Sequence, residues 1–381
     1  MSTFITYPLT VRVIAALAVA LLISLIATPP VKRFAQRVGA IDVPQDGRRV
    51  HNVPIPRLGG LAIFIGFVIS VVIFAEIGRA LQGILIGSVI IVAVGVADDI
   101  VPLRAWQKFL LQIVAASSPV LHGVVIELVS NPNVLSEAAY LNLGYFAIPL
   151  TVIWIVGITN AVNLIDGLDG LAVGVSTISS LTMLVVALLI TADVNVALVL
   201  AALAGACLGF MPYNLNPAKI FMGDTGALLL GYLLATMSIM GLFKSYAIIS
   251  FAVPFIALAL PILDTLFAIL RRVAKGQSPM SPDRGHLHHR LLDYGFSQKQ
   301  AVFIIYLISG FLGMIAVIMT SSGQVRVVFT VVTFVAVAAM ILIVTRGTLL
   351  KPRGNGKGNT AEEDTQQLEG QMEMGDDHES D

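Results

Sequence analysis

The sequence predicts an all-α membrane protein that crosses the bilayer many times. Hydrophobic residues make up 57% of the 381 residues, and only 12% are charged, against about 25% in an average soluble domain. The apolar residues also fall into long runs separated by short polar loops. Composition and patterning therefore indicate a polytopic membrane protein with its polar residues concentrated in loops.

Eleven apolar runs approach the length of a spanning helix, which needs about 20 mostly apolar residues. The first run is followed by Lys32, Arg33 and Arg37 rather than a cleavage pattern, so it is interpreted as a helix and not a signal peptide. The predicted spans are residues 9–28, 58–76, 81–98, 106–124, 145–163, 169–190, 194–213, 226–243, 246–271, 300–320 and 325–346.

The distribution of positive charge predicts the orientation of these helices. If the N-terminus lies outside, only Arg12, Arg79, Lys244 and Arg326 of the 23 lysines and arginines fall on the outer side. Cytoplasmic loops carry an excess of Lys and Arg. The sequence therefore predicts an outer N-terminus, five cytoplasmic loops and a cytoplasmic C-terminal tail.

Two further segments stand apart from the spans. Residues 126–143 have strand-like halves around Asn131-Pro132-Asn133 and predict a small hairpin on the outer face. Residues 351–381 form an acidic tail after a membrane domain of residues 1–350, and too little apolar surface is present there to order it. The single cysteine, Cys207, excludes a disulfide framework within one chain.

Asp98 and Asp99 end one predicted span at the cytoplasmic side. Adjacent carboxylates repel each other and favour a cation or a proton between them, and Mg²⁺ prefers such hard oxygen ligands. The alternative is an acid pair that faces water, paired with Arg104 or Lys108.

The stretch from Thr159 to Ala172, TNAVNLIDGLDGLA, is the most informative one. Acids at a membrane helix end are costly and usually mark a site. Gly167 and Gly170 break the helix and allow a ligand to approach the backbone. Capping of the next helix would explain Asp169. It would not explain the full set of polar side chains, which are Asn160, Asn163, Asp166 and Asp169.

The loop YNLNPAKIFMGDTG, residues 213–226, contains Asn214, Lys219 and Asp224. Asp224 taken alone is expected to be an N-cap of the following helix. A helix start also offers free N–H groups to a phosphate. An acid for a metal and a lysine for a phosphate in one short loop suit a nucleotide diphosphate.

Two basic loops complete the cytoplasmic side. His286, His288 and His289 lie in GHLHHR with no cysteine nearby for a zinc site, so they predict phosphate binding or proton handling. Asp264 lies near them and is expected either to line the pocket or to pair with a basic neighbour. Arg57, in PIPRLGG, is either a membrane-flanking residue or a phosphate contact.

These motifs together resemble the polyprenyl-phosphate N-acetylhexosamine-1-phosphate transferases, glycosyltransferase family 4, over about residues 8–346. The likeness is carried by PIPRLGG, GVADD, TNAVNLIDGLDGLA, NPAKIFMGDTG and the HLHH loop, in the family's order. Many members have a third acid three residues beyond the aspartate pair. Here that position is Pro102, so a third metal-binding acid is not expected.

The resemblance implies an enzyme of a bacterial plasma (inner) membrane that transfers a sugar 1-phosphate from a UDP-sugar to undecaprenyl phosphate and releases UMP. It favours UDP-N-acetylglucosamine as donor, for polymers such as teichoic acid or lipopolysaccharide O-antigen. The peptidoglycan relative that uses UDP-N-acetylmuramoyl-pentapeptide is the nearer alternative. A homodimer is expected by analogy, and no nucleic-acid partner is expected.

The resemblance also implies roles for the residues. Asp224 would bind Mg²⁺, or Mn²⁺ in its place, with Asp99 as second ligand, and Asp98 would act as base or support the attack. The nucleotide would be held by Asn163, Asp166, Asp169 and Asn214. Phosphates would be contacted by Lys108, Lys219, Arg57, His286, His288 and His289. Direct attack by the lipid phosphate is favoured, because that phosphate is already a nucleophile.

Two other classes of protein compete with this prediction. A transporter also uses intramembrane acids and broken helices, but its acids would lie near the bilayer midplane and not at helix ends on one side. A receptor or assembly subunit without chemistry would leave the gathered Asp, Asn and His unexplained.

Overall fold

The computed structural model describes residues 8–43, 54–130, 140–190, 193–243, 254–277, 285–321, 323–324, 326–331 and 333. These residues belong to one unit, Met1–Thr333, and are helical apart from two short pairs of antiparallel strands. Among them, seven helices are long and apolar enough to cross a membrane. The predicted fold class is therefore confirmed, while the predicted number of eleven spans is not.

Most of the long helices match predicted spans within a few residues. They are α1 (Leu9–Val38), α3 (Arg79–Ile100), α5 (Ala147–Ile165) after the 3₁₀ turn η1 (Gly144–Phe146), α6 (Leu171–Ile190), α7 (Val194–Asn214), α8 (Gly223–Ser238) with the π-helical turn η2 (Ile239–Phe243), and α12 (Gln298–Thr320).

The remaining predicted spans form shorter helices. These are α2 (Gly60–Phe74), α4 (Ala105–Leu121) and α10 (Ala259–Ala274), with 15, 17 and 16 residues. A short helix, α11 (Leu287–Asp293), precedes α12. The spans predicted for α2 and α4 exceed these helices because hydropathy also counts the apolar residues in the turns that flank a helix. Residues 246–253 of the span predicted for α10 lie outside the described residues. The predicted span 325–346 and the tail lie mostly or wholly outside the described residues.

Helix α1 is longer than predicted, because Pro29 and Pro30 do not end it. The missing N–H groups of two prolines leave carbonyls without partners, and hydroxyl groups can satisfy such carbonyls inside a membrane helix. The carbonyls that lose their partners are those of Leu25 and Ile26, four residues before each proline. Thr28 donates its Oγ1 hydrogen to the neighbouring Ser24 carbonyl at 2.7 Å. The helix continues to Val38, where Gly39 caps it in the left-handed conformation.

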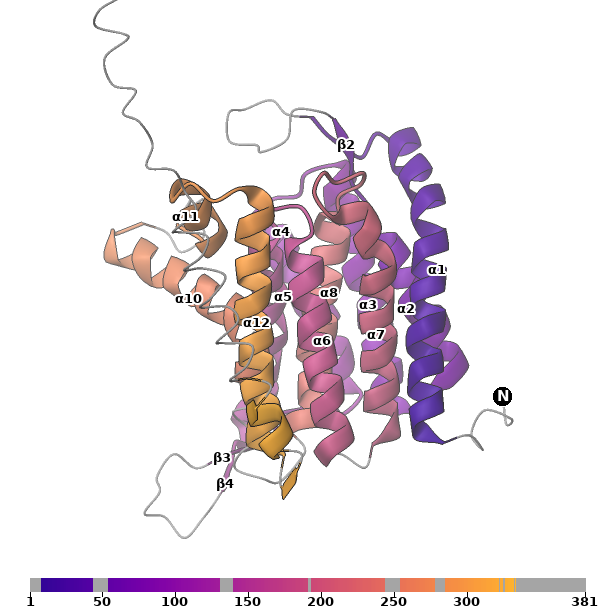
Figure 1. Cartoon of the computed structure of the whole chain (residues 1–381), viewed down its shortest axis with the longest axis vertical. Helices are drawn as coiled ribbons and strands as arrows, with labels where there is room; N and C mark the ends of the chain where they lie inside the picture. Colours follow the sequence, from indigo (N-terminus) through magenta and orange to yellow (C-terminus); the bar gives the residue numbers. More distant parts are fainter. Residues whose placement is uncertain are drawn as a thin grey trace, which may run out of the picture. The chain divides into compact units, whose positions relative to one another are not determined.

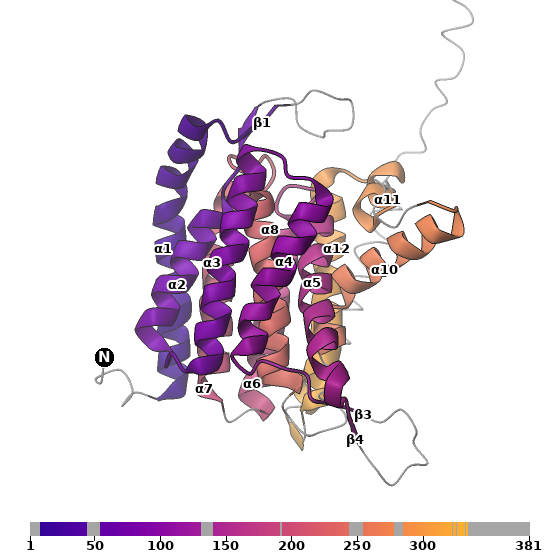
Figure 2. The ribbon, with the colours of Figure 1, turned by 180° about the vertical axis from the view of Figure 1, so that it is seen from behind.

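Helices α7 and α8 form the centre of the bundle. In their most apolar windows 78% and 89% of the residues are buried, against 22% in α1. Figure 1 shows α7 between α1 and α6, and Figure 2 shows α3, α4 and α5 on the other side of α8. Helix association in lipid depends on small residues that let backbones approach. Gly205 and Gly209 of α7 supply them toward α1.

The two strand pairs lie at opposite ends of the bundle (Figure 1). At one end β1 (Ile41–Asp42) pairs with β2 (Ile55–Pro56), beside the loop that joins α7 to α8. At the other end β3 (Leu128–Ser130) pairs with β4 (Tyr140–Asn142), which confirms the predicted hairpin. Its proposed turn, residues 131–133, lies outside the described residues.

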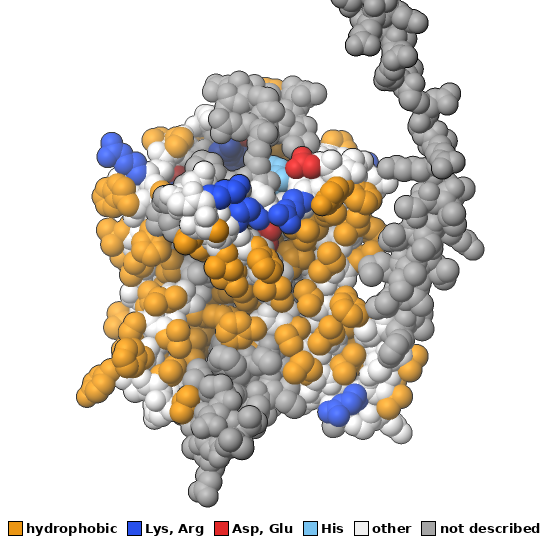
Figure 3. Space-filling model, turned by 90° about the vertical axis from the view of Figure 1, so that its left-hand side faces the viewer, with side chains coloured by type: hydrophobic (Ala, Val, Ile, Leu, Met, Phe, Trp, Pro, Cys, Tyr) orange, Lys and Arg blue, Asp and Glu red, His pale blue; other side chains and the backbone are white. Residues whose placement is uncertain are grey.

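The face seen in Figure 3 carries lysine and arginine side chains near the β1–β2 end, above a broad band of hydrophobic side chains. Exposed apolar side chains of α4, among them Trp106, Leu110 and Val114, are 59%, 52% and 49% exposed. A soluble protein rarely exposes such a band, whereas lipid covers it without cost. The band therefore marks the part of the bundle that the bilayer surrounds.

Candidate functional site

A cavity of about 830 Å³ lies at the β1–β2 end of the bundle. Its walls are helix ends and the connections between them, so segments far apart in the sequence meet there. Most predicted site residues line it, namely Arg57, Asp99, Asn163, Asp166, Asp169, Asn214, Lys219, Asp224 and His289. The other predicted residues, Asp98, Lys108, His286 and His288, are not among the lining residues but contact segments that are.

Asp99 joins the end of α3 to the start of α8. Its carboxylate accepts hydrogen bonds from Asp224 N and Thr225 N, both at 3.0 Å, and from Thr225 Oγ1 at 2.6 Å. These amides are unsatisfied within a helix, and the N-cap residue Met222 makes no side-chain bond to them. Asp99 thus caps α8 from another helix. Gly223 permits this contact, because its φ is +70° and a Cβ there would overlap the Asp99 carboxylate.

Asp224 lies inside the first turn of α8, so the expectation that it is the N-cap is wrong. Its Oδ1 accepts a hydrogen bond from Asn163 Nδ2 at 3.2 Å, and its Oδ2 pairs with the Lys108 ammonium. Lys108 also contacts Asp98 Oδ2 at 2.8 Å, and Asp98 Oδ1 accepts the Leu103 amide. One lysine of α4 therefore bridges carboxylates of α3 and α8, and Arg104 is not part of this bridge.

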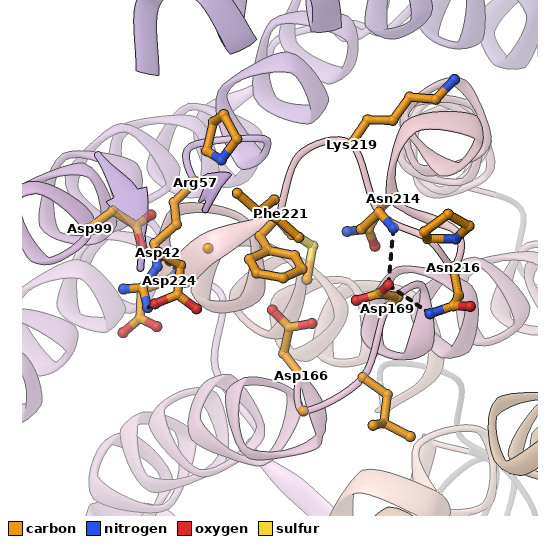
Figure 4. A pocket seen from close by; sticks show the side chains of 18 of the residues that line it. Asp42, Arg57, Asp99, Asp166, Asp169, Asn214, Asn216, Lys219, Phe221 and Asp224 are labelled. Atoms are coloured by element: carbon orange, nitrogen blue, oxygen red, sulfur yellow. Dashed lines mark hydrogen bonds and ion pairs between the residues drawn. The ribbon is translucent and has the colours of Figure 1, made fainter. Parts of the chain in front are cut away.

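The turn after α5 brings Asp166 into the cavity, where Figure 4 shows it across from Phe221. No hydrogen bond from the described residues reaches its carboxylate. Burial raises the pKa of Asp166 to about 8, and the carboxylates of Asp224, Asp99 and Asp169 add to the rise. Arg57 opposes it. The cavity thus gathers carboxylates around a buried Asp166, a condition that favours a proton or a bound cation there.

Asp169 holds the α7–α8 loop and does not cap α6. Its Oδ2 accepts hydrogen bonds from Asn216 Nδ2 and Ala218 N, both at 3.0 Å (Figure 4). Asn214 also ties the start of α6 to this loop, because its Oδ1 accepts a hydrogen bond from Gly170 N and its Nδ2 donates one to the Ile220 carbonyl. The capping alternative for Asp169 is therefore wrong, and both side chains fix the loop that carries Lys219 and Phe221.

Arg57 and Lys219, two of the cations that line the cavity, differ in their surroundings. Arg57 forms an ion pair with Asp42 at 2.7 Å, across the β1–β2 pair. Lys219 shares a loop with Asp224, but Figure 4 shows it on the other side of the cavity, beyond Asn214. Lys108, from a different helix, is the lysine that contacts Asp224.

The histidines lie at the start of α11, whose N-cap is His286. His286 Nδ1 is 2.9 Å from Asp264 Oδ2, which resolves the open prediction for Asp264: it pairs with a basic neighbour. His288 is 3% exposed, and burial together with His289 and His286 lowers its pKa to about 4. His288 is therefore neutral near pH 7, and only His289 of the three lines the cavity.

The cavity also contains residues that the sequence did not reveal as a group. They are Lys32, Gln36, Asp42, Asn216, Phe221 and Gln298. Asn216 and Phe221 lie inside a predicted loop motif and could have been included. Lys32 and Gln36 are one helical turn apart on α1, and the proline pair before them concealed that the helix continues.

The oxygen donors around Asp224 are of the kind that Mg²⁺ prefers, namely carboxylates of Asp99, Asp166 and Asp224 with the Asn163 amide. In the part of the chain that the structure describes, no three His, Cys, Asp or Glu side chains are grouped closely enough to hold a metal ion. The donor set thus fits Mg²⁺ in chemical type, with substrate oxygens and water left to complete its coordination.

Comparison with known proteins places the chain among membrane sugar-phosphate transferases. Residues 81–242 match the family model "Glycosyl transferase family 4". The chain is 44% identical over 338 residues to a probable undecaprenyl-phosphate N-acetylglucosaminyl 1-phosphate transferase of Bacillus subtilis (strain 168), covering 87% of this chain and 92% of that protein. It is 39% identical over 321 residues to a decaprenyl-phosphate N-acetylglucosaminephosphotransferase of Mycobacterium tuberculosis, covering 76% and 78%.

A phospho-N-acetylmuramoyl-pentapeptide-transferase of Desulfitobacterium hafniense is 31% identical over 338 residues, which cover 82% of this chain and 99% of that protein. The matched family region includes both ends of the Lys108 bridge, Asp98 and Asp224, together with the turn that carries Asp166. The chain belongs to glycosyl transferase family 4.

Proposed function

We propose that the chain transfers N-acetylglucosamine 1-phosphate from UDP-N-acetylglucosamine to undecaprenyl phosphate and releases UMP. The names of the relatives at 44% and 39% identity support this donor over the muramoyl-pentapeptide nucleotide, whose transferase is 31% identical. Such a step begins a cell-wall or surface polysaccharide on its lipid carrier.

The observation that carries the proposal is the meeting of Asp99, Asp166 and Asp224 with cationic and amide side chains in one cavity at helix ends. The acceptor's isoprenoid chain stays in hydrocarbon, whereas the UDP-sugar comes from water. A cavity at the end of the bundle serves both substrates. The charge asymmetry of the loops supports a cytoplasmic cavity and an outer N-terminus.

The reaction we propose is a direct displacement. An oxygen of the lipid phosphate attacks the phosphorus that carries the sugar, and the bond from that phosphorus to the UMP oxygen breaks with its electron pair. The product is a lipid diphosphate sugar, and UMP leaves. Phosphoryl transfer of this kind depends on positioning and on charge stabilisation. Lys108 and Lys219 suit contact with the phosphates.

The roles of the other residues follow from their surroundings. The ring of Phe221 lies in the middle of the cavity beside Asp166 (Figure 4) and offers a stacking face to the uracil base. The loop that Asp169 and Asn214 hold, and Asn163, suit contact with the rest of the nucleotide. His289 and Arg57 suit the diphosphate, and Asp98 keeps Lys108 in place and supports the attack.

We further propose that Asp224 binds Mg²⁺, with Asp99 as second ligand. Each carboxylate oxygen has two lone pairs, so Asp99 retains acceptor capacity beyond its bonds to α8. Bound Mg²⁺ would offset the repulsion between the two anionic substrates. Lys108 contacts one oxygen of Asp224 and Asn163 the other, which orients that carboxylate.

The test uses purified protein, undecaprenyl phosphate, Mg²⁺ and radiolabelled UDP-sugars. We expect label from UDP-N-acetylglucosamine in the lipid phase, equimolar UMP, loss of transfer with EDTA, and recovery with Mg²⁺ or Mn²⁺. Preferential use of UDP-N-acetylmuramoyl-pentapeptide would show that the proposed donor, UDP-N-acetylglucosamine, is wrong. If no UDP-sugar supports transfer and the protein instead carries solute across vesicle membranes, the proposed enzymatic function is wrong and the protein is a transporter.

A further inference from the structure

Asp264 is a buried carboxylate outside the cavity, and both of its oxygens are engaged by the histidine segment. Its Oδ2 pairs with His286 Nδ1 at 2.9 Å, and its Oδ1 accepts the Leu287 amide at 2.8 Å. The side chains of Asp264 and His286 are 9% and 6% exposed. A carboxylate accepts and does not donate, so His286 donates its Nδ1 proton to it.

Helix α10 contacts the same segment a second time. Arg271 is seven residues after Asp264 and therefore on the same face of α10. The backbone of Gly285 lies so close to the Arg271 guanidinium that a Cβ at Gly285 would overlap it. Ala268, between these positions on the helix, is fully buried, while Phe267 and Leu270 are 59% and 53% exposed. One face of α10 thus holds residues 285–287.

The histidine rings connect this anchor to the cavity. The rings of His286 and His288 are parallel within 8° with centroids 5.8 Å apart, and those of His288 and His289 are 4.3 Å apart. The His288 ring packs against Gly167, where a Cβ would overlap its Nε2. Gly167 and His289 both line the cavity. The contacts therefore lead from Asp264 to the turn that carries Asp166.

We propose that Asp264 is a positioning residue of the transfer reaction. Through His286 it fixes residues 285–289 against Gly167, which sets the places of His289 and Asp166 in the cavity. Asp264 itself touches no cavity residue that faces a substrate, so it acts through the histidines. The inference rests on the proposed function for its catalytic consequence and on the contacts above for its structural part.

The first measurement does not depend on activity. Diethyl pyrocarbonate modifies accessible histidines, and mass spectrometry locates the modified residue. In the parent protein His286 and His288, 5% and 3% exposed, should react slowly. Asp264→Ala should increase the modification of both histidines. The modification of His122, the C-cap of α4, should not change. Equal modification in parent and variant would overturn the proposal.

The second measurement is transfer from UDP-N-acetylglucosamine. Side chains that orient a functional group through a hydrogen bond typically contribute about 10–100-fold. We expect Asp264→Asn and His286→Ala each to lower kcat/KM in this range. The double variant should be no worse than the poorer single one, because both changes break one contact. Asp293→Asn, an exposed acid on α11, is the charge-matched control and should retain parent activity.

Multiplicative losses in the double variant, or an Asp264→Asn rate within about twofold of the parent, would overturn the positioning role. Size-exclusion profiles identify variants that fail to fold. If Asp264→Asn fails to fold, Asp264→Glu is measured in its place. If the parent transfers no sugar phosphate, the proposed function fails and the catalytic role of Asp264 fails with it. The labelling result then shows separately whether the Asp264–His286 contact forms.

Discussion

At the scale of single residues, the acids of the cavity divide by what their carboxylates bind. Asp99 and Asp169 accept backbone N–H groups and hold α8 and the α7–α8 loop in place. Asp224 is held by side chains, Lys108 and Asn163 among them, and Asp166 receives no hydrogen bond from the described residues. The carboxylates of Asp224 and Asp166 are therefore not committed to the backbone and are available to a ligand or a metal ion, beside the acceptor capacity that Asp99 retains.

The first prediction concerns the Lys108 bridge. Asp224→Asn and Asp98→Asn each remove one of its two anionic partners, and we expect turnover to fall roughly 100-fold or more, as on loss of other preorganised charge contacts. Steady-state transfer from radiolabelled UDP-N-acetylglucosamine measures the effect. Both variants should insert and purify normally.

Asp193→Asn is the matched control for this pair, because Asp193 caps α7 at the opposite end of the bundle and asparagine also caps well. Its turnover should equal that of the parent. A near-normal rate in Asp224→Asn or Asp98→Asn would remove that residue from the site.

The second prediction is a pH dependence of stability. The pKa of His288 is about 4 in the fold, against 6.5 for a histidine in water, so the unfolded chain takes up the proton first as pH falls. The contribution of His288 is fully present above pH 6.5 and is lost between about pH 6.5 and 4, up to roughly 3 kcal/mol.

His288→Phe keeps a ring against Gly167 but cannot titrate. The thermal midpoint of this variant in detergent should therefore fall less between pH 7 and pH 5 than that of the parent. Comparing how steeply the two thermal midpoints change with pH cancels the contributions of the other titratable groups, which both proteins share. Equal slopes in the two proteins would contradict the buried, neutral state of His288.

At the scale of elements, close helix packing sets the shape of the cavity rim. Lys32 and Gln36 reach the cavity because α1 continues beyond the proline pair and packs along α7. Gly205 and Gly209 of α7 lie against the Leu17 and Leu21 carbonyls, and a Cβ at either position would overlap them. The α1–α7 contact thus positions two rim residues that the helix pattern alone does not place there.

The third prediction tests that contact. Gly209→Ala should lower the free energy of unfolding by about 1–3 kcal/mol, the usual cost of overpacking, and should reduce the thermal midpoint in detergent. Gly157→Ala is the control, because no atom lies within 4 Å of a Cβ built there and alanine favours the helix. Equal midpoints for the two variants would show that α1 and α7 do not pack this closely.

At the scale of the whole molecule, the connections at one end of the bundle line the cavity, and among the described residues those at the other end do not contribute to it. The lining residues come from α1, the β1–β2 pair and the connections at the same end, whereas the β3–β4 hairpin is at the opposite end (Figure 1). This division agrees with a reaction between a water-borne donor and a membrane-borne acceptor.

The fourth prediction concerns the acidic tail, which lies outside the described residues. Because it offers little apolar surface for packing, a chain that ends at Leu350 should keep its transfer rate within about twofold and its thermal midpoint unchanged. Activity assays and thermal scans of the truncated and full-length proteins measure this. Loss of transfer on truncation would give the tail a role in the reaction.

The sequence by itself determined the membrane class, the β3–β4 hairpin and most of the acidic residues that line the cavity. It could do so because each of these features is local: apolar runs, strand-like halves and costly acids at helix ends are visible without knowing the fold. The same local signals ended α1 at its prolines, because hydropathy and helix-breaking residues do not show where packing against another helix lets a helix continue.

Only the tertiary structure decided which residue contacts which. Asp99 proved to cap α8 from α3, Lys108 rather than Lys219 proved to contact Asp224, and Asp264 proved to hold His286. These pairs are 126, 116 and 22 residues apart in the chain. Their partners are set by how helices pack side by side, and packing depends on shape complementarity between distant segments, which no local pattern of residues encodes.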